Sequence, residues 1–309
     1  MKLSLNKNAT RLLTGSIFGF SALACLLNGG IALLSLIFLF MCLGSREYVG
    51  ILKYKGFFPS LKIIIIANII LALLSYFNRF DLVTVALTWA SISAFMWVLF
   101  KGRQPYIANV ATTILGVVYC GWFPLHLLFL RGLNAENYQG FLKLNLQNAG
   151  LGYVMLLFVV VVLTDTGGYY FGKNFGKTLL APTVSPKKTI EGAVGGTIFA
   201  LIGAFIVGYF IKLPWYHCVI AGLLITAFAQ IGDLCESLIK RDAGVKDSGT
   251  LLPGHGGLLD RTDSYILSVP VLFYYLKYFV VSNQLWFDFV NFVNIFIHSL
   301  KGFLHALGL

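Results

Sequence analysis

Long apolar stretches alternate with short polar segments along the whole 309-residue chain. A helix needs about 20 mainly apolar residues to cross a bilayer, and the apolar runs recur at about this length. Their pattern predicts nine membrane-spanning helices, at residues 12–28, 30–45, 57–77, 81–100, 108–130, 151–172, 192–211, 215–235 and 264–281. We therefore expect an all-α, polytopic integral membrane protein.

The polar segments divide the chain into three parts. Residues 1–150 hold the N-terminal transmembrane helices, and residues 151–284 hold a transmembrane region with two polar loops, 173–191 and 236–263. In the tail, residues 285–309, polar side chains recur every three or four positions, at Asp288, Asn291, Asn294 and His298. This spacing places a polar stripe on a helix, so we expect an amphipathic, membrane-associated tail in preference to a tenth span.

Composition and charge support a membrane location. The chain is 58% hydrophobic and 11% charged, whereas soluble domains carry roughly 25% charged residues. Five cysteines without paired spacing favour buried thiols over a disulfide framework or a zinc site. If the N-terminus is cytoplasmic, 17 of the 23 lysines and arginines lie in inner segments. The formal charge of +11 therefore predicts a cytoplasmic N-terminus and cytoplasmic polar loops, and not nucleic-acid binding.

The two polar loops concentrate the basic residues of the C-terminal half. Eight lie there: Lys173, Lys177, Lys187, Lys188, Lys240, Arg241, Lys246 and Arg261. A solvated inner loop explains any one of them, but eight beside several carboxylates are typical of a site for a polyanion and a metal. Ser185 is a candidate contact within the first loop, and a helix cap formed with Pro186 is the structural alternative.

Acidic residues lie just inside the spans that flank these loops. Asp165 follows an apolar run, and an acid at such depth usually has a functional partner; an interfacial pair with a nearby lysine is the alternative. Asp260 and Asp263 share a face if the last span starts here, and Asp233 ends the preceding span. These three carboxylates suit Mg²⁺, which prefers oxygen ligands and shares its shell with phosphates. Glycines near Gly256 resemble a flexible phosphate cradle.

The second loop resembles the signature of phosphatidate cytidylyltransferases, also called CDP-diacylglycerol synthases. The 27-residue match has no departure, and its residues are Ser237, Lys240, Arg241, Lys246, Asp247, Gly249, Leu252, Pro253, His255, Gly256, Gly257, Asp260, Arg261 and Asp263. The segments starting at Asp165 and Ser185 also resemble the C-terminal half of this family. Residues 1–150 match in hydropathy alone, so the resemblance says little about their details.

The resemblance implies a reaction in which a phosphatidate oxygen attacks the α-phosphorus of CTP and pyrophosphate leaves. It implies Mg²⁺, with K⁺ as a candidate second cation, a homodimer, and a bacterial inner membrane as the location. The implied catalytic residues are Lys240, Arg241, Lys246, Arg261 and His255; the substrate-binding residues are Ser185, Lys187, Lys188, Ser237, Gly256, Gly257 and Asp165; and the metal ligands are Asp233, Asp260 and Asp263.

Several alternatives remain open from the sequence. His255 could serve as an acid, although loop positioning or a hydrogen bond to phosphate is preferred, since an ionised phosphate needs no general base. A transporter could use Asp165 and Asp233 as an ion path, and a lipid or polyprenol kinase would transfer the γ-phosphate instead. The label position that reaches the lipid separates the two enzymes.

Overall fold

The computed structural model describes residues 7–77, 79–133, 149–249, 256–282, 291 and 293. In this part of the chain the elements are α1 (Lys7–Asn28), α2 (Gly30–Tyr54), α3 (Leu61–Tyr76), η1 (Phe80–Leu82), α4 (Val83–Lys101), α5 (Tyr106–Val117), η2 (Val118–Trp122), α6 (Phe123–Arg131), α7 (Ala149–Phe175), β1 (Leu179–Ala181), β2 (Ser185–Thr189), α8 (Ile190–Phe210), α9 (Trp215–Asp242), η3 (Leu259–Arg261), α10 (Asp263–Tyr275) and η4 (Leu276–Val281). The all-α class is confirmed, and the two-stranded hairpin β1–β2 is an unpredicted addition.

Each of the nine predicted spans overlaps a helix, but their number is not confirmed. Seven helical segments of the described chain are long and apolar enough to cross a membrane. The apolar part of the first helix, Gly19–Asn28, and the third helix, Leu61–Tyr76, are shorter. The protein is thus a multi-pass helical protein. Most of the tail predicted at 285–309 lies outside the described residues.

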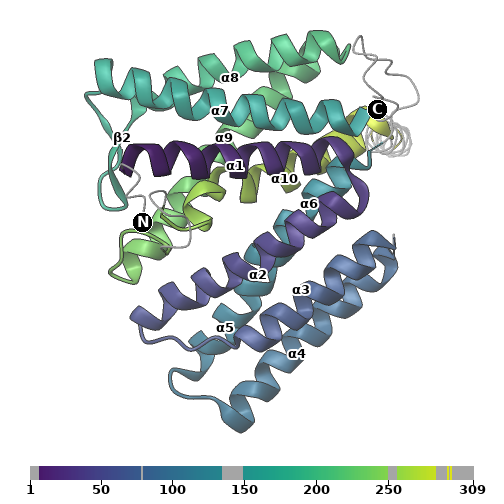
Figure 1. Ribbon diagram of the computed structural model, residues 1–309, viewed down its shortest axis with the longest axis vertical. Helices are drawn as coiled ribbons and strands as arrows, with labels where there is room; N and C mark the ends of the chain where they lie inside the picture. The colour runs from purple at the N-terminus through teal and green to yellow at the C-terminus, as the bar shows by residue number, and fades with distance from the viewer. Residues whose placement is uncertain are drawn as a thin grey trace, which may run out of the picture.

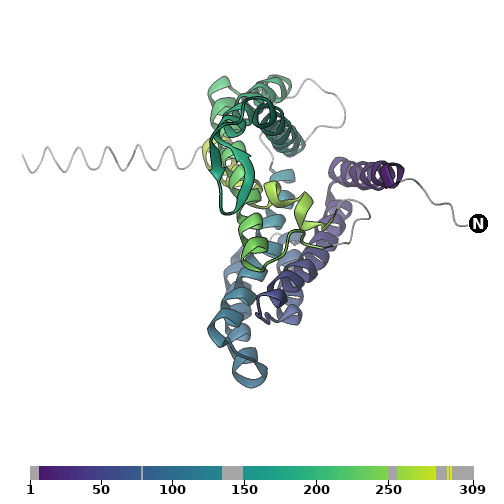
Figure 2. The same ribbon diagram turned by 90° about the vertical axis from the view of Figure 1, so that its left-hand side faces the viewer.

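The helices form two groups that meet at α6. Helices α2 to α5 make one group, and α7 to α10 make the other (Figure 1). Helix α6 contacts both α2 and α10, and its fully buried Leu125 and Leu130 belong to the common core. The view turned by 90° shows that α1 projects away from the other helices (Figure 2).

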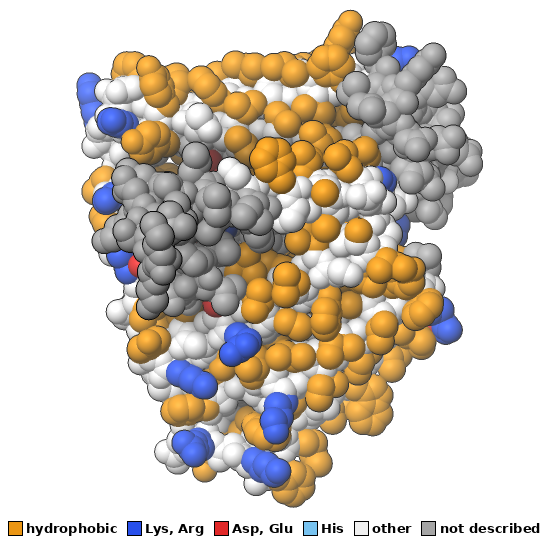
Figure 3. All heavy atoms as spheres, viewed as in Figure 1, with side chains coloured by type: hydrophobic (Ala, Val, Ile, Leu, Met, Phe, Trp, Pro, Cys, Tyr) orange, Lys and Arg blue, Asp and Glu red, His pale blue; other side chains and the backbone are white. Residues whose placement is uncertain are grey.

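Apolar side chains cover much of the outer surface as well as the core. Figure 3 shows hydrophobic side chains spread over this face, with basic side chains gathered near the lower end. Phe95, Leu99, Ile107 and Tyr209 are among the exposed large hydrophobics. Such a surface is unfavourable in water and is stable against lipid, where a helix satisfies its own backbone hydrogen bonds.

Glycines allow α7 and α8 to pack closely. A Cβ atom at Gly196 would lie 2.7 Å from the carbonyl oxygen of Thr164, and one at Gly192 would lie 2.8 Å from that of Gly168. Small residues at a helix interface let backbones approach within van der Waals distance, which is a main source of helix association in membranes. This close packing fixes where α7 ends and α8 begins, and so fixes the hairpin between them.

The hairpin excludes the helix cap as the role of Ser185, since this residue lies in β2 opposite Ala181. Its contact with substrate stays a prediction. The cap is Thr189, whose side chain accepts a hydrogen bond from the N–H of Gly192 at 3.1 Å. Glu191 accepts the N–H groups of Lys177 and Thr178, at 3.0 and 3.1 Å, and closes the base of the hairpin.

Contacts place both polar loops at the same end of the molecule. The Arg241 side chain donates to the carbonyl of Val184 in the hairpin at 3.4 Å. At this end Lys55 also pairs with Asp242 at 2.9 Å. Sequence segments that the charge pattern assigned to one side of the membrane are therefore neighbours in space.

We expect the close approach of α7 and α8 to make Gly196→Ala destabilising, because the added methyl group meets backbone atoms that cannot move aside. Overpacking of this kind costs roughly 1–3 kcal/mol. Gly50→Ala is the matched control, since nothing lies within 4 Å of a Cβ built at that helical glycine. Thermal unfolding in detergent should show a lower Tm for Gly196→Ala alone; equal Tm values would contradict the packing argument.

We expect a cysteine at Lys187 to react with thiol reagents only from the cytoplasmic side, in a background without the five native cysteines. A cysteine at Lys212, in the exposed turn between α8 and α9, is the matched control and should react from outside intact cells. The reason is the positive-inside distribution of basic residues. Labelling of the Lys187 position from outside would reverse the predicted orientation.

Candidate active site

An acidic cluster lies where α7, α9 and α10 meet under the hairpin. Asp233 of α9 pairs with Lys188 of β2 at 2.6 Å. Asp165 of α7 and Asp263 of α10 both interact electrostatically with Asp233. The structure therefore brings together four of the predicted site residues, one from the hairpin and three from helices. Asp165 also interacts electrostatically with Lys188, in line with the alternative of a nearby lysine.

Glu236 is a member of the cluster that the sequence analysis did not assign. It lies one helical turn after Asp233, its exposed fraction is 1%, and its Oε1 is 3.2 Å from the ammonium group of Lys240. No N–H or hydroxyl group of the described residues donates to its Oε2. The buried hydroxyl of Tyr119, from η2, has no hydrogen-bond partner within the described part of the chain and interacts electrostatically with Glu236. Unsatisfied polar atoms of this kind are rare in cores and point to a missing ion, water or ligand.

Asp260 lies beside this cluster, in the 3₁₀ turn η3 that precedes α10. Its Oδ1 accepts a hydrogen bond from Lys240 at 2.6 Å. Its Oδ2 accepts the N–H and hydroxyl of Ser248 and the N–H of Gly257, each at 2.9 Å. Burial raises the pKa of Asp260, but these donors outweigh it and hold the pKa below its ordinary value. Its stabilising contribution is present at neutral pH and is lost as the pH falls through that lowered pKa.

The expectation that Asp260 and Asp263 share one helix face is wrong. Asp260 lies in the 3₁₀ turn η3. Thr262 has a non-helical conformation, with φ −126° and ψ 0°, and separates this turn from α10, which starts at Asp263. The physical reason is the set of donors around Asp260, which holds its side chain toward Ser248 and Lys240. Asp263 instead starts α10 and accepts the N–H of Ser264 at 2.8 Å. Glu236 interacts electrostatically with both aspartates.

In the predicted phosphate cradle, the backbone N–H of Gly257 is already engaged, as are those of the two residues that follow it. The N–H of Gly257 is directed to Asp260, and those of Leu258 and Leu259 are each bound at 2.9 Å by the carboxylate of Glu47. Gly256 is required for its backbone conformation, since its φ is +85°. The loop is thus held by carboxylates of the protein itself. Glu47 was missed because the first half of the chain resembled the family in hydropathy alone.

The remaining predicted residues lie at the same end. Lys187, Lys246 and Arg261 are exposed, and Ser237 lies one turn from Asp233 with its hydroxyl 3.5 Å from Oδ1. Arg241 donates to the carbonyl groups of Val184 and Val245, both at 3.4 Å, so it ties the hairpin to the loop after α9. His255 lies outside the described residues.

The donor set fits a hard divalent cation. Five carboxyl groups, those of Asp165, Asp233, Glu236, Asp260 and Asp263, are accompanied by only two close ammonium groups, those of Lys188 and Lys240. The described residues contain no preformed group of three or more metal-ligating side chains. Asp260 is the least available of the three predicted ligands because both its oxygens have donors. Asp233 and Asp263 are more available, and the acidic excess around them favours a cation.

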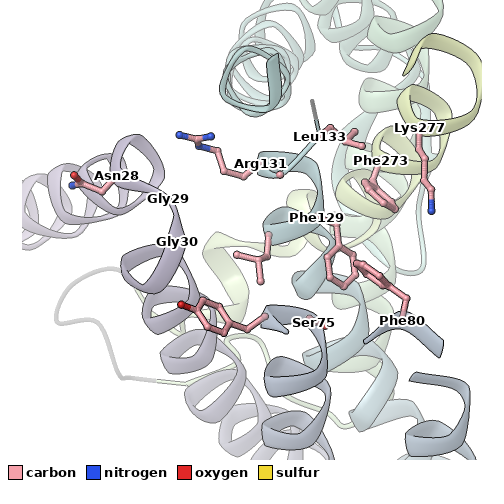
Figure 4. Close-up of a pocket in the computed structure, with 13 residues that line it drawn as sticks. Asn28, Gly29, Gly30, Ser75, Phe80, Phe129, Arg131, Leu133, Phe273 and Lys277 are labelled. Carbon is pink, nitrogen blue, oxygen red and sulfur yellow. The ribbon is translucent and has the colours of Figure 1, made fainter. Parts of the chain in front are cut away.

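A hollow of about 440 Å³ lies at the opposite end of the molecule. Figure 4 shows Arg131 directed toward the α1–α2 turn and Lys277 on the opposite wall, with Phe80, Phe129 and Phe273 between them. The guanidinium of Arg131 donates to the carbonyl groups of Leu26 and Leu27. None of the described residues that line it is acidic, so this hollow is distinct from the acidic cluster.

Comparison with known proteins shows which family the chain belongs to. The profile of the Cytidylyltransferase family matches residues 9–279. Phosphatidate cytidylyltransferase of Synechocystis sp. is 35% identical over 284 residues, which cover 86% of this chain and 96% of the relative. The Staphylococcus saprophyticus protein of the same name is 35% identical over 271 residues, covering 85% and 96%. That of Bacillus subtilis is 44% identical over 137 residues, covering 44% and 51%.

The fold and the site define a class of protein: a helical membrane protein in which acidic and basic residues gather at one end of the spans. Within that class, the chain belongs to the cytidylyltransferase family, and it is a nucleotidyltransferase. Family membership suggests a divalent-metal requirement in general, and it confirms the resemblance seen in the loop 236–263.

We expect Asp260→Asn to lower the free energy of unfolding by about 3 kcal/mol, because it leaves the charge of Lys240 in a half-buried position without its closest partner. The side chains of this pair are only 10% and 11% exposed. Asp81→Asn is the matched control, since the Arg79–Asp81 pair is 56% and 61% exposed and such pairs contribute little. Denaturant unfolding in detergent would refute the assignment if both variants matched the parent protein.

Proposed function

We propose that this protein joins CTP to phosphatidate within the membrane, making CDP-diacylglycerol and releasing pyrophosphate. The observation that carries the proposal is the acidic cluster of Asp165, Asp233, Glu236 and Asp263 beside basic loops, at the ends of apolar helices. Near-full-length relatives that carry the name phosphatidate cytidylyltransferase support it.

The position of the site suits one lipid and one soluble substrate. The acyl chains of phosphatidate stay in the bilayer, and CTP arrives from water. Asp165 and Asp233 lie within the C-terminal halves of α7 and α9, and Asp263 starts α10. A site buried in the middle of the bundle would require CTP to leave water, whereas a fully exposed loop would require the lipid to leave the bilayer.

The chemistry needs charge neutralisation more than acid–base catalysis. A phosphate monoester has a second pKa of about 6, so phosphatidate is largely ionised at neutral pH and is itself the nucleophile. Its oxygen forms a bond to the α-phosphorus of CTP as the bond to the bridging oxygen breaks, and the β- and γ-phosphates leave as pyrophosphate. The difficulty is to hold two polyanions together, which positioned cations overcome.

Each basic residue then has a distinct task. Lys187, Lys246 and Arg261 are exposed at the site end and are proposed to bind phosphate oxygens. Lys188 is held close by its pair with Asp233, and Lys240 offsets the charge of Asp260 and Glu236. Lys240 therefore acts on substrate through the carboxylates it contacts. Arg241 positions the hairpin, and Ser185, Ser237, Gly256 and His255 remain proposed contacts.

We propose Mg²⁺ as the divalent metal, with K⁺ as a candidate second cation. Asp233 and Asp263 would hold it, and Glu236 is an added ligand candidate because its buried Oε2 receives no N–H or hydroxyl donor from the described chain. When bound, the metal would neutralise phosphate charge and favour departure of pyrophosphate. The charge pattern and the bacterial relatives support a bacterial inner membrane as the location. The homodimer stays a proposal from the family resemblance alone.

We expect purified protein, given phosphatidate and Mg²⁺, to transfer radioactive phosphorus into lipid from the α position of CTP and to release γ label as pyrophosphate. Asp263→Asn should lose at least 90% of this activity and need more Mg²⁺, because one oxygen ligand is gone. Asp81→Asn, at the far end, is the control. Lipid that carries γ label would indicate a kinase, and no transfer of either label would leave transport as the better explanation; both results overturn the proposal.

A further inference from the structure

The carboxylate of Glu47 binds the catalytic loop from the opposite half of the molecule. Glu47 lies in α2 with an exposed fraction of 8%. Its Oε1 accepts the N–H of Leu258 at 2.9 Å. Its Oε2 accepts the N–H of Leu259 at 2.9 Å and faces the hydroxyl of Ser248 at 3.3 Å. Among the described residues Glu47 has no ion-pair partner, so these donors alone compensate its buried charge.

Two glycines of the loop lie against this carboxylate. A Cβ atom at Gly249 would lie 2.9 Å from Oε1 of Glu47, so a side chain there would push the carboxylate away. A Cβ atom at Gly257 would first meet the hydroxyl of Ser248 and would also lie 2.9 Å from Oε2 of Glu47. The two glycines therefore leave room for the carboxylate and for the serine that it faces.

Ser248 connects Glu47 to the charged site. The Ser248 hydroxyl lies 3.3 Å from Glu47 and 2.9 Å from Oδ2 of Asp260, and Asp260 in turn holds Lys240 at 2.6 Å. A shift of the loop would move Asp260 and the start of α10, where Asp263 lies. The order of the loop thus depends on a residue more than 200 positions earlier in the chain.

We propose that Glu47 is a positioning residue, which holds Ser248, Leu258 and Leu259 in the geometry that the nucleotide site needs. It touches no substrate in this role. The N-terminal half, whose sequence gave no assigned function, thereby supplies a necessary part of the site. The kinetic consequence rests on the proposed function, but the structural consequence does not.

The test is Glu47→Gln, which keeps size and replaces one acceptor oxygen by an NH₂ group facing an N–H donor. Hydrogen exchange followed by mass spectrometry should show at least tenfold faster exchange in the peptide that contains Leu258 and Leu259, because hydrogen bonds to charged acceptors are among the strongest. Exchange in α8 should not change. The KM for CTP should rise at least tenfold, whereas a purely structural defect would reduce the active fraction and leave KM as it was.

Asp242→Asn is the matched control: it also changes a carboxylate to an amide in a contact between the two halves, but the Lys55–Asp242 pair is 41% and 58% exposed. It should leave exchange and KM unchanged. Gly249→Ala is a second variant, which should displace the Glu47 carboxylate and so speed exchange in the same loop. It replaces Glu47→Gln in the test if that variant does not fold.

Unchanged loop exchange in a folded variant, or faster exchange spread equally over α8, would overturn the positioning role. So would an unchanged KM for CTP in active protein. If the parent protein transfers no label from CTP, the proposed function fails, while the exchange comparison still decides whether Glu47 holds the loop.

Discussion

Compensation of buried carboxylates is the constraint on which the rest of this structure depends. Ionised groups removed from water are costly unless each has a partner, and here five carboxyl groups gather at the ends of apolar helices. Lys188 reaches Asp233, and Lys240 reaches both Glu236 and Asp260. The hairpin, the loop after α9 and the start of α10 are arranged by these pairs. The acidic excess that remains around Asp233 and Asp263 suits a cation.

The helix packing serves this arrangement. Close contact of α7 with α8 through glycines sets the base of the hairpin, from which Lys188 extends to α9. Helix α2 supplies Glu47 to the loop, and η2 supplies Tyr119 to the cluster. The two helical groups are therefore joined by polar contacts at the site as well as by the apolar core around α6. In a membrane, where apolar burial gives little preference for one helix pair over another, such polar contacts and close backbone packing specify the arrangement.

The same balance of charge accounts for the proposed chemistry. A reaction between two phosphate anions needs cations that are positioned before substrate arrives, and it needs no strong base. Lysines that are held by carboxylates keep their place without substrate, whereas the side chains of Lys187 and Lys246 are exposed at the same end.

The sequence by itself determined the class, the family and the end of the molecule where the chemistry lies. Apolar runs near the bilayer thickness specify membrane helices, because the backbone has no other way to satisfy its hydrogen bonds in lipid. The 236–263 segment carried enough mixed chemistry to reveal the family. Only the tertiary structure decided which groups each of these side chains contacts. Asp260 and Asp263, three residues apart, face different partners because Thr262 breaks the helix between them. Glu47 became visible only when folding brought α2 against Leu258 and Leu259. Contacts between distant segments have no pattern along the chain, since they depend on how the helices pack.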